Sequence, residues 1–147
     1  TPVITTAETP FESGKSQVFW TSASPQVAIF SMGYMTYHAL LAAKELEKEG
    51  INSLVINVAT IKPLDEKGIL EAVGQTKAVV TVEDHQVMGG LGGTIAELLA
   101  KNSPTPMEFV GLQDTFAESG KPNEILKKYK MDAPAIIEAA KKVIGRK

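Results

Sequence analysis

Residues 79–99 read VVTVEDHQVMGGLGGTIAELL. A β-branched run ends in three ionisable side chains, passes through a glycine-rich loop and restarts with the apolar spacing of a helix. In open α/β sheets, ligands and partners meet the protein at the carboxyl ends of the parallel strands. We therefore expect this segment to build such a strand end, with Glu83, Asp84 and His85 placed on it.

The composition is that of an ordinary globular domain. The chain has 147 residues, of which 44% are hydrophobic and 22% are charged, and is most simply one domain. Its formal net charge of −2 gives no electrostatic footprint for nucleic acid or for an anionic membrane. The absence of cysteine excludes disulfides, thiolate nucleophiles and cysteine-based zinc sites.

The sequence carries no targeting or membrane signal. No apolar run approaches the ~18 residues of a membrane span, and no basic and apolar secretory pattern opens the chain. We therefore expect a cytoplasmic protein. Because the chain begins at Thr1 rather than at a methionine, we also expect a fragment of something longer.

Strands and helices alternate along the chain. Residues 1–14 lack periodicity and are expected to form a linker or arm, which leaves 15–147 as the domain. Runs at 15–20 and 26–31 flank a polar turn and predict a hairpin whose first strand is an antiparallel edge strand. Three more strands and five helices are expected further on, the strands at 53–58, 78–82 and 107–111. This order predicts an α/β fold, a three-layer αβα arrangement with a mostly parallel five-stranded sheet.

The three ionisable residues at the end of the central strand are the first site candidates. A histidine there could move a proton near neutral pH, with a flanking carboxylate to orient it. No recognisable nucleophile accompanies His85. We expect Glu83, Asp84 and His85 to lie at an interface or at the mouth of a substrate site; a catalytic role for His85 and a purely structural role are the alternatives.

The glycine loop allows two interpretations. Gly89, Gly90 and Gly92 precede a helix, and such a loop can hold phosphate on its backbone N–H groups. The sequence does not fit G-x-x-x-x-G-K-[ST], because no lysine follows the glycines, and it fits G-x-G-x-x-G poorly. The pattern favours the other interpretation, in which small residues let the start of the helix pack closely on a neighbouring backbone.

Two further loops follow strand ends. Lys62 could reach an anion, but Pro63 and Asp65 favour a rigid turn in which Asp65 caps the next helix. Glu118 and Ser119 could line the same site; the alternative is a turn with Gly120 at positive φ. His38 is expected to pack within the first helix, and no helix-spaced pair of ligands predicts a metal site.

Four segments together resemble the C-terminal domain of transketolases, and the resemblance extends over roughly residues 15 to 146. The segments at 56–65, with its Thr60-Ile61-Lys62-Pro63-Leu64-Asp65, and at 82–92, with its Glu83-Asp84-His85, are the most specific; the others are 27–33 and 111–120. Residues 1–3 and 11–15 also resemble the passage that leaves the preceding pyrimidine-binding domain. The variant resembled most is the split, archaeal-type transketolase.

The resemblance implies a five-stranded mixed sheet with one antiparallel strand and a homodimer in the complete enzyme. It implies a part in moving two-carbon ketol units between sugar phosphates, as in the pentose phosphate pathway, with thiamine diphosphate and Mg²⁺. The implied partners are the diphosphate- and pyrimidine-binding domains, which carry that chemistry. The Gly-Asp-Gly signature for the Mg-diphosphate is absent here, so the resemblance assigns this chain no cofactor, no metal and no catalytic residue.

The sequence thus predicts an accessory and dimerisation domain that is inactive alone. The equivalent domain of deoxyxylulose-phosphate synthase or of a 2-oxoacid dehydrogenase β subunit is an alternative within the family. A separate alternative is an independent regulatory module that binds a phosphorylated ligand at the Glu83–Gly93 strand end.

Overall fold

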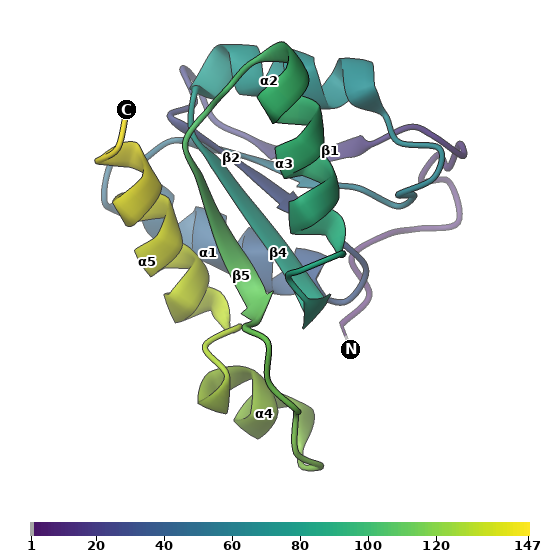
Figure 1. The fold of residues 1–147 in the computed structure, drawn as a ribbon, viewed down its shortest axis with the longest axis vertical. Helices are drawn as coiled ribbons and strands as arrows, with labels where there is room; N and C mark the ends of the chain where they lie inside the picture. The colour runs from purple at the N-terminus through teal and green to yellow at the C-terminus, as the bar shows by residue number, and fades with distance from the viewer. Residues whose placement is uncertain (1) are drawn as a thin grey trace.

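The computed structural model describes residues 2–147 and contains one five-stranded sheet. The strands lie in the order β1-β3-β2-β4-β5, and Figure 1 shows α3 in front of the sheet and α1 behind it. Only β1 runs antiparallel, against β3, and the other three pairings are parallel. The strand bounds are β1 Gln17–Thr21, β2 Val27–Ser31, β3 Ser53–Asn57, β4 Val79–Gln86 and β5 Met107–Leu112.

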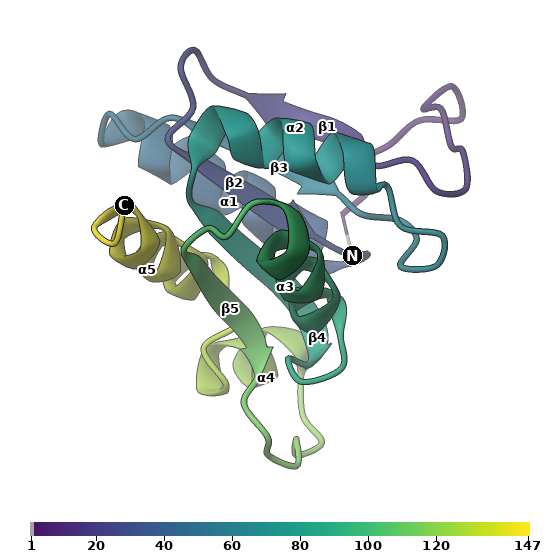
Figure 2. The same cartoon turned by 45° about the horizontal axis from the view of Figure 1, so that its top comes forward.

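Helices cover both faces of the sheet, which confirms the expected three-layer arrangement. On one face, α1 and α5 pack against Val27, Ile29 and Val80; on the other, α2 and α3 pack against Ala28 and Phe30. Figure 2 shows these two layers from a tilted view. The helix bounds are α1 Met35–Lys48, α2 Glu66–Thr76, α3 Leu91–Asn102, α4 Pro122–Lys128 and α5 Ala133–Ile144. No helix within residues 2–147 is long and apolar enough to cross a membrane.

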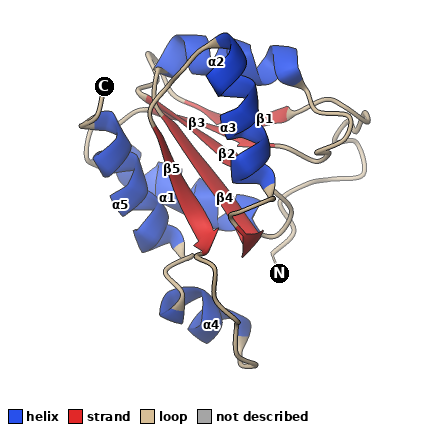
Figure 3. Ribbon diagram, viewed as in Figure 1, coloured by secondary structure: helices blue, strands red, loops and turns tan. Residues whose placement is uncertain are grey.

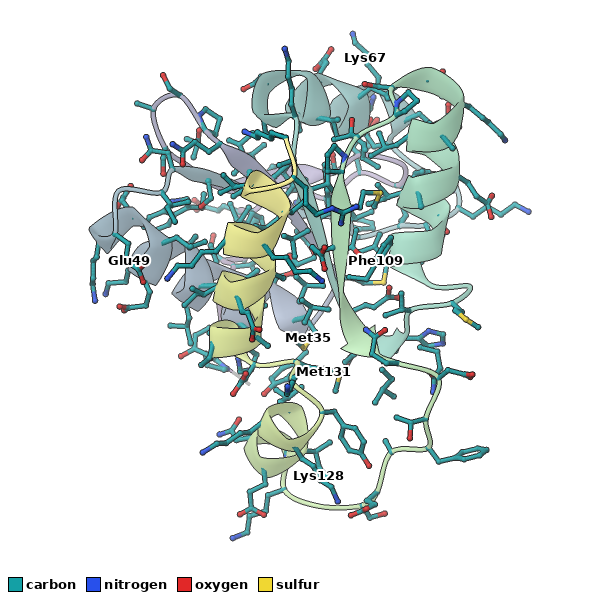
Figure 4. All side chains as sticks on the ribbon, turned by 60° about the vertical axis from the view of Figure 1, so that its left-hand side comes forward. Met35, Glu49, Lys67, Phe109, Lys128 and Met131 are labelled. Carbon is teal, nitrogen blue, oxygen red and sulfur yellow. The ribbon has the colours of Figure 1, made fainter. Side chains whose placement is uncertain are left out.

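The central strands are apolar for a physical reason. All five residues of β2 are buried, because the strand has a parallel neighbour on each side and a helical layer on each face. Such strands have no solvent face and therefore lose the alternation of an antiparallel strand. Figure 4 shows Met35 of α1 and Met131 near each other; both belong to the core beneath α1 and α5.

The predicted hairpin between the first two strands is wrong. β1 pairs with β3, with Gln17 opposite Asn57, while β2 pairs with β3 and β4. The connecting residues cross the end of β3, where the Gln26 N–H donates to the Asn52 carbonyl at 2.8 Å. β1 is only half-buried and suits an edge, whereas the fully buried β2 has a parallel partner on each side. The expectation of an antiparallel edge strand is confirmed.

Asp65 joins the start of α2 to the segment entering β1. Its Oδ1 accepts from the Gly68 N–H at 3.2 Å, so the predicted cap of α2 is present. Its Oδ2 accepts from the Ser16 N–H at 2.9 Å and from the Ser16 hydroxyl at 2.7 Å. Partial burial alone would raise the pKa of this carboxyl, but the hydrogen bonds from Ser16 and Gly68 outweigh it and hold the pKa below its usual value.

The lowered pKa makes a stability prediction with a definite sign. A carboxyl whose pKa is depressed on folding stabilises the protein above its unfolded pKa of about 3.9, and this contribution is lost as the pH falls below that value. We expect Asp65→Asn to lower the free energy of unfolding by about 1–2 kcal/mol at pH 7 and by less at pH 3. Urea unfolding at both pH values measures this, with Glu66→Gln, an exposed neighbour, as the control. Equal losses at the two pH values would contradict the assignment.

Candidate functional site

The carboxyl ends of the four parallel strands meet at one edge of the sheet. Figure 3 shows α4 and the loop after β5 projecting beyond this edge, past the ends of β4 and β5. Glu83, Asp84 and His85 lie in the last half of β4, as the sequence predicts. The start of α1 and the loop that contains Lys62 follow β2 and β3 at the same edge.

Glu83 does not face a ligand but the start of α3. The residue is 3% exposed, and its Oε2 accepts from the Leu91 N–H at 2.8 Å while Oε1 accepts from the Gly92 N–H at 2.9 Å. The N-cap residue of α3, Gly90, supplies no side-chain cap. The carboxylate of β4 therefore satisfies the first N–H groups of α3 and lies at the positive end of its dipole.

The glycines of the loop are required by this close approach. A Cβ at Gly90 would overlap the Glu83 carboxylate and lie 2.7 Å from the Gln86 carbonyl oxygen. A Cβ at Gly92 would lie 2.6 Å from Cδ1 of Phe109 and 2.8 Å from Oγ1 of Thr81. The close-packing interpretation of this loop agrees with the structure, and the position that a phosphate would take on the N–H groups of α3 is filled by Glu83.

Asp84 and His85 are exposed, in contrast to the buried Glu83. The Nδ1 atom of His85 lies 2.8 Å from the Gln86 carbonyl oxygen, and this contact orients the ring on the surface. Asp84 lines a hollow of about 820 Å³ between α1 and α4, together with Tyr34, Tyr37 and residues of α4. We call this the α1–α4 hollow. No group of three metal-ligating side chains occurs within the described part of the chain.

The other predicted site residues do not converge on Asp84 and His85. Lys62 is exposed and lines a different hollow, against Thr94 and Glu97 of α3. Gly89 is an exposed turn residue with φ +81°. Glu118 pairs with Lys128 of α4 at 2.6 Å, and Ser119 beside it is exposed. The strand edge thus carries these residues as separate groups.

The predicted positive φ of Gly120 is wrong. In the turn after β5, it is Asp114 that adopts a left-handed conformation, with φ +50°. At Gly120 the constraint is space, because a Cβ there would lie 2.9 Å from Cδ1 of Ile125. An aspartate tolerates the left-handed region through its short polar side chain, so glycine was not needed for that turn.

His38 packs within α1, as expected. It is 9% exposed, lies edge-on to the rings of Tyr34 and Tyr37, and its Nε2 is 3.2 Å from the Tyr34 hydroxyl. Burial lowers the pKa of the imidazole, against an opposing attraction from Asp132. The ring is thus held as a neutral core group.

Two features of this edge escape reasoning from the sequence. Phe116 is 97% exposed in the loop after β5, and Met88 is 70% exposed in the loop after β4. For Phe116 the signal in the sequence is a large apolar residue in a loop that contains glycine and serine, since nothing in its own segment could bury it.

The second feature is a chain of hydrogen-bonded polar side chains. Ser31 donates to Thr36, Thr36 to Asn57, and Asn57 to Gln17, over distances of 3.0–3.2 Å.

The chain is a three-layer α/β domain whose buried strand-end carboxylate caps a helix and whose exposed Asp84 lines an open hollow. The family model described as the transketolase C-terminal domain matches residues 17–136. The chain belongs to that family.

Three relatives, two of known sequence and one of solved structure, are similar to this chain. A 6-deoxy-6-sulfo-D-fructose transketolase subunit of Clostridium sp. (strain MSTE9) is 44% identical over 121 residues, which are 82% of this chain and 38% of that protein. A 1-deoxy-D-xylulose-5-phosphate synthase of Caldanaerobacter subterraneus subsp. tengcongensis is 38% identical over 129 residues, 87% of this chain and 20% of that protein. A solved structure titled a split gene transketolase, inactive β4 tetramer, has a TM-score of 0.92 and 39% identity, and the match covers 98% of this chain and 46% of that one. The chain therefore spans less than half the length of these relatives.

Removal of the Glu83 carboxylate is expected to destabilise the fold strongly. Glu83→Ala leaves the buried N–H groups of Leu91 and Gly92 without partners, a loss of about 2–5 kcal/mol in the free energy of unfolding. Chemical unfolding measures this, with Asp84→Ala as the exposed neighbouring control, for which a change within about 0.5 kcal/mol is expected. Similar losses in the two variants would overturn the assignment of Glu83 as the cap of α3.

The two glycines at the start of α3 provide a matched pair. Gly92→Ala brings a methyl group against Phe109 and Thr81 and is expected to cost about 1–3 kcal/mol. At Gly93 the nearest atom to an added Cβ is 3.7 Å away, so Gly93→Ala is expected to be neutral or to stabilise by up to about 1 kcal/mol. Thermal unfolding of both variants checks which is the less stable. A Gly93→Ala variant that is less stable than Gly92→Ala would contradict the prediction.

Proposed function

We propose that this chain is the C-terminal accessory and dimerisation domain of a transketolase-type enzyme and is not catalytic alone. The complete enzyme would transfer two-carbon ketol units between sugar phosphates in the cytoplasm, in the pentose phosphate pathway. Thiamine diphosphate and Mg²⁺ would be bound by the diphosphate- and pyrimidine-binding domains, on the same or a partner chain. Those domains are the partners proposed for this one.

The observation that carries this proposal is the internal use of Glu83. The N-terminus of α3, where an open α/β domain would hold a diphosphate on backbone N–H groups, is filled by a carboxylate of the same chain. A diphosphate placed there would meet like charge and no free N–H group of Leu91 or Gly92. The N-terminus of α3 therefore does not fit the diphosphate of thiamine diphosphate, and this argues equally against a regulatory phosphate site at the same position.

Membership of the family supports the rest of the proposal. The chain matches the C-terminal domain model and spans 38% to 46% of a transketolase subunit and of a split-gene transketolase, so the remaining lengths of those relatives hold further domains. That split-gene relative is titled an inactive assembly of four β copies. By analogy, we propose that this domain also associates with copies of itself and lacks activity until the other domains join it.

The equivalent domain of a deoxyxylulose-phosphate synthase is the second candidate. It is favoured by a synthase relative that is 38% identical over 87% of this chain. The alternative of a 2-oxoacid dehydrogenase β subunit has no comparable relative among those described above.

The absence of cofactor binding is the first test. Calorimetric titration of the chain with thiamine diphosphate and Mg²⁺ is expected to give no saturable heat, because the N–H groups of α3 are already occupied. Stoichiometric binding in the micromolar range, worth about 8 kcal/mol, would contradict the proposal. If such binding appears, Asp84→Asn and Lys62→Ala would show which hollow holds the ligand.

Reconstitution tests the role in the whole enzyme. The chain is combined with separately produced diphosphate- and pyrimidine-binding domains. The mixture is then assayed for three reactions: ketol transfer, deoxyxylulose-phosphate synthesis and 2-oxoacid dehydrogenation. Activity is expected only when this domain is present, and only in the ketol-transfer assay. Full activity of the other domains without this chain would overturn the accessory role, and activity in the synthase assay would establish the second candidate.

A further inference from the structure

β5 is the outer strand at the edge of the sheet opposite β1, and Figure 4 shows it, with Phe109 labelled, beside α5. The Pro106 carbonyl, just before the strand, accepts from the Val79 N–H of β4 at 3.1 Å. Pro106 and every second residue after it therefore turn their backbone groups toward β4. The N–H and C=O groups of Met107, Phe109 and Gly111 point the other way, where β5 pairs with no strand of residues 2–147.

An edge of this kind is a template for pairing with another extended chain, because its free backbone groups can continue the sheet. The opposite edge strand, β1, is irregular, with a register shift between Val18 and Trp20. The pairing of β5 is regular from Met107 to Val110, and a hollow of about 280 Å³ lies between residues 108–111 and α5. The helix thus leaves space beside the strand, and the protection of this edge has to come from elsewhere.

Two side chains occupy the carbonyl groups along the free edge of β5. The Gln113 side-chain amide donates to the carbonyls of Phe109 and Gly111, at 3.3 Å each. The Nη1 atom of Arg146 donates to the Met107 carbonyl at 2.8 Å. All three outward carbonyls of the strand are therefore already hydrogen-bonded, and an incoming strand would find no free acceptor among them.

Arg146 is held beside the strand by Glu108. The Glu108 carboxylate accepts from Arg146 Nη1 at 2.6 Å and from Lys142 of α5 at 2.9 Å. Partial burial alone would raise the pKa of Glu108, but the hydrogen bonds and charges of Lys142 and Arg146 outweigh it and hold the pKa below its usual value. The carboxylate is thus ionised at neutral pH and keeps the guanidinium over the Met107 carbonyl.

We propose that Gln113 and Arg146 close the free edge of β5 against the addition of a further strand. Their side chains supply the hydrogen bonds that the N–H groups of a neighbouring strand would otherwise supply. An extended chain that pairs with β5 first has to displace both of them. This inference does not depend on the proposed function, because it concerns the lateral edge of the sheet and not the carboxyl ends of its strands.

Aggregation of the 147-residue chain, followed by thioflavin T fluorescence and light scattering, tests the proposal. Gln113→Ala and Arg146→Ala are each expected to speed the formation of strand-paired aggregates, and the double variant by at least about fivefold, the factor that corresponds to one net hydrogen bond. The matched controls are Gln75→Ala and Lys127→Ala, which remove an exposed amide and an exposed cation from α2 and α4 and should aggregate like the wild type. Urea unfolding of every variant separates this effect from a loss of stability.

Gln113→Ala carries the test alone if Arg146→Ala lowers the urea midpoint, because Gln113 is exposed and its amide bonds, within the described chain, only to these two carbonyls. Hydrogen exchange then identifies the strand that pairs. The amides of Phe109 and Gly111 are expected to become protected in the aggregates of this variant. Aggregation of Gln113→Ala at the rate of the wild type or of Gln75→Ala would overturn the proposal, as would aggregates in which these two amides exchange freely.

Discussion

The bond between the Glu83 carboxylate and the first N–H groups of α3 is the constraint on which the functional edge depends. A helix that follows a strand end begins with N–H groups that need acceptors, and the N-cap position of α3 is a glycine without a side chain. The acceptor comes instead from the preceding strand. This choice brings α3 so close to β4 and β5 that Gly90 and Gly92 have no room for a Cβ. The glycine-rich loop, which could be taken for a phosphate-binding loop, therefore serves to pack the start of α3 against the sheet.

Carboxylate side chains also cap the first N–H groups of α2 and α5. Asp65 caps α2 and also accepts two hydrogen bonds from Ser16. It therefore joins the segment that enters the edge strand β1 to the start of α2. Asp132 caps α5 through the Ala135 N–H at 3.3 Å. Three carboxylates are thus used as helix caps, where they oppose the positive ends of the helix dipoles. The acidic groups that remain free at the strand ends are surface groups such as Asp84, beside the exposed ring of His85.

Local features were predictable from the sequence, and non-local ones were not. Asp65 lies directly before its helix, so its capping role follows from the order of residues, as does the alternation of strands and helices. The cap of α3, Glu83, lies eight residues before Leu91, the first residue whose N–H donates to it, and can be found only when the β4–α3 geometry is known. The pairing of β1 with β3 rather than β2 depends on which strand can tolerate an edge, which is a property of the whole sheet. Likewise Phe116 could be read from the sequence as apolar, but its exposure of 97% is a property of the folded chain.

These arrangements support the proposal that the domain is an accessory part of a larger enzyme. Catalytic sites keep polar groups unpaired and preorganised for a substrate, whereas here the most deeply placed strand-end carboxylate is fully engaged with its own chain. What this edge leaves exposed is an aromatic ring on the loop after β5, a methionine on the loop after β4 and an open hollow beside α4. Exposed apolar side chains are costly to leave in water and gain most when another protein surface covers them. The end of β4 is thus divided between a buried carboxylate that serves the fold of this chain and exposed apolar groups that nothing in the described chain covers.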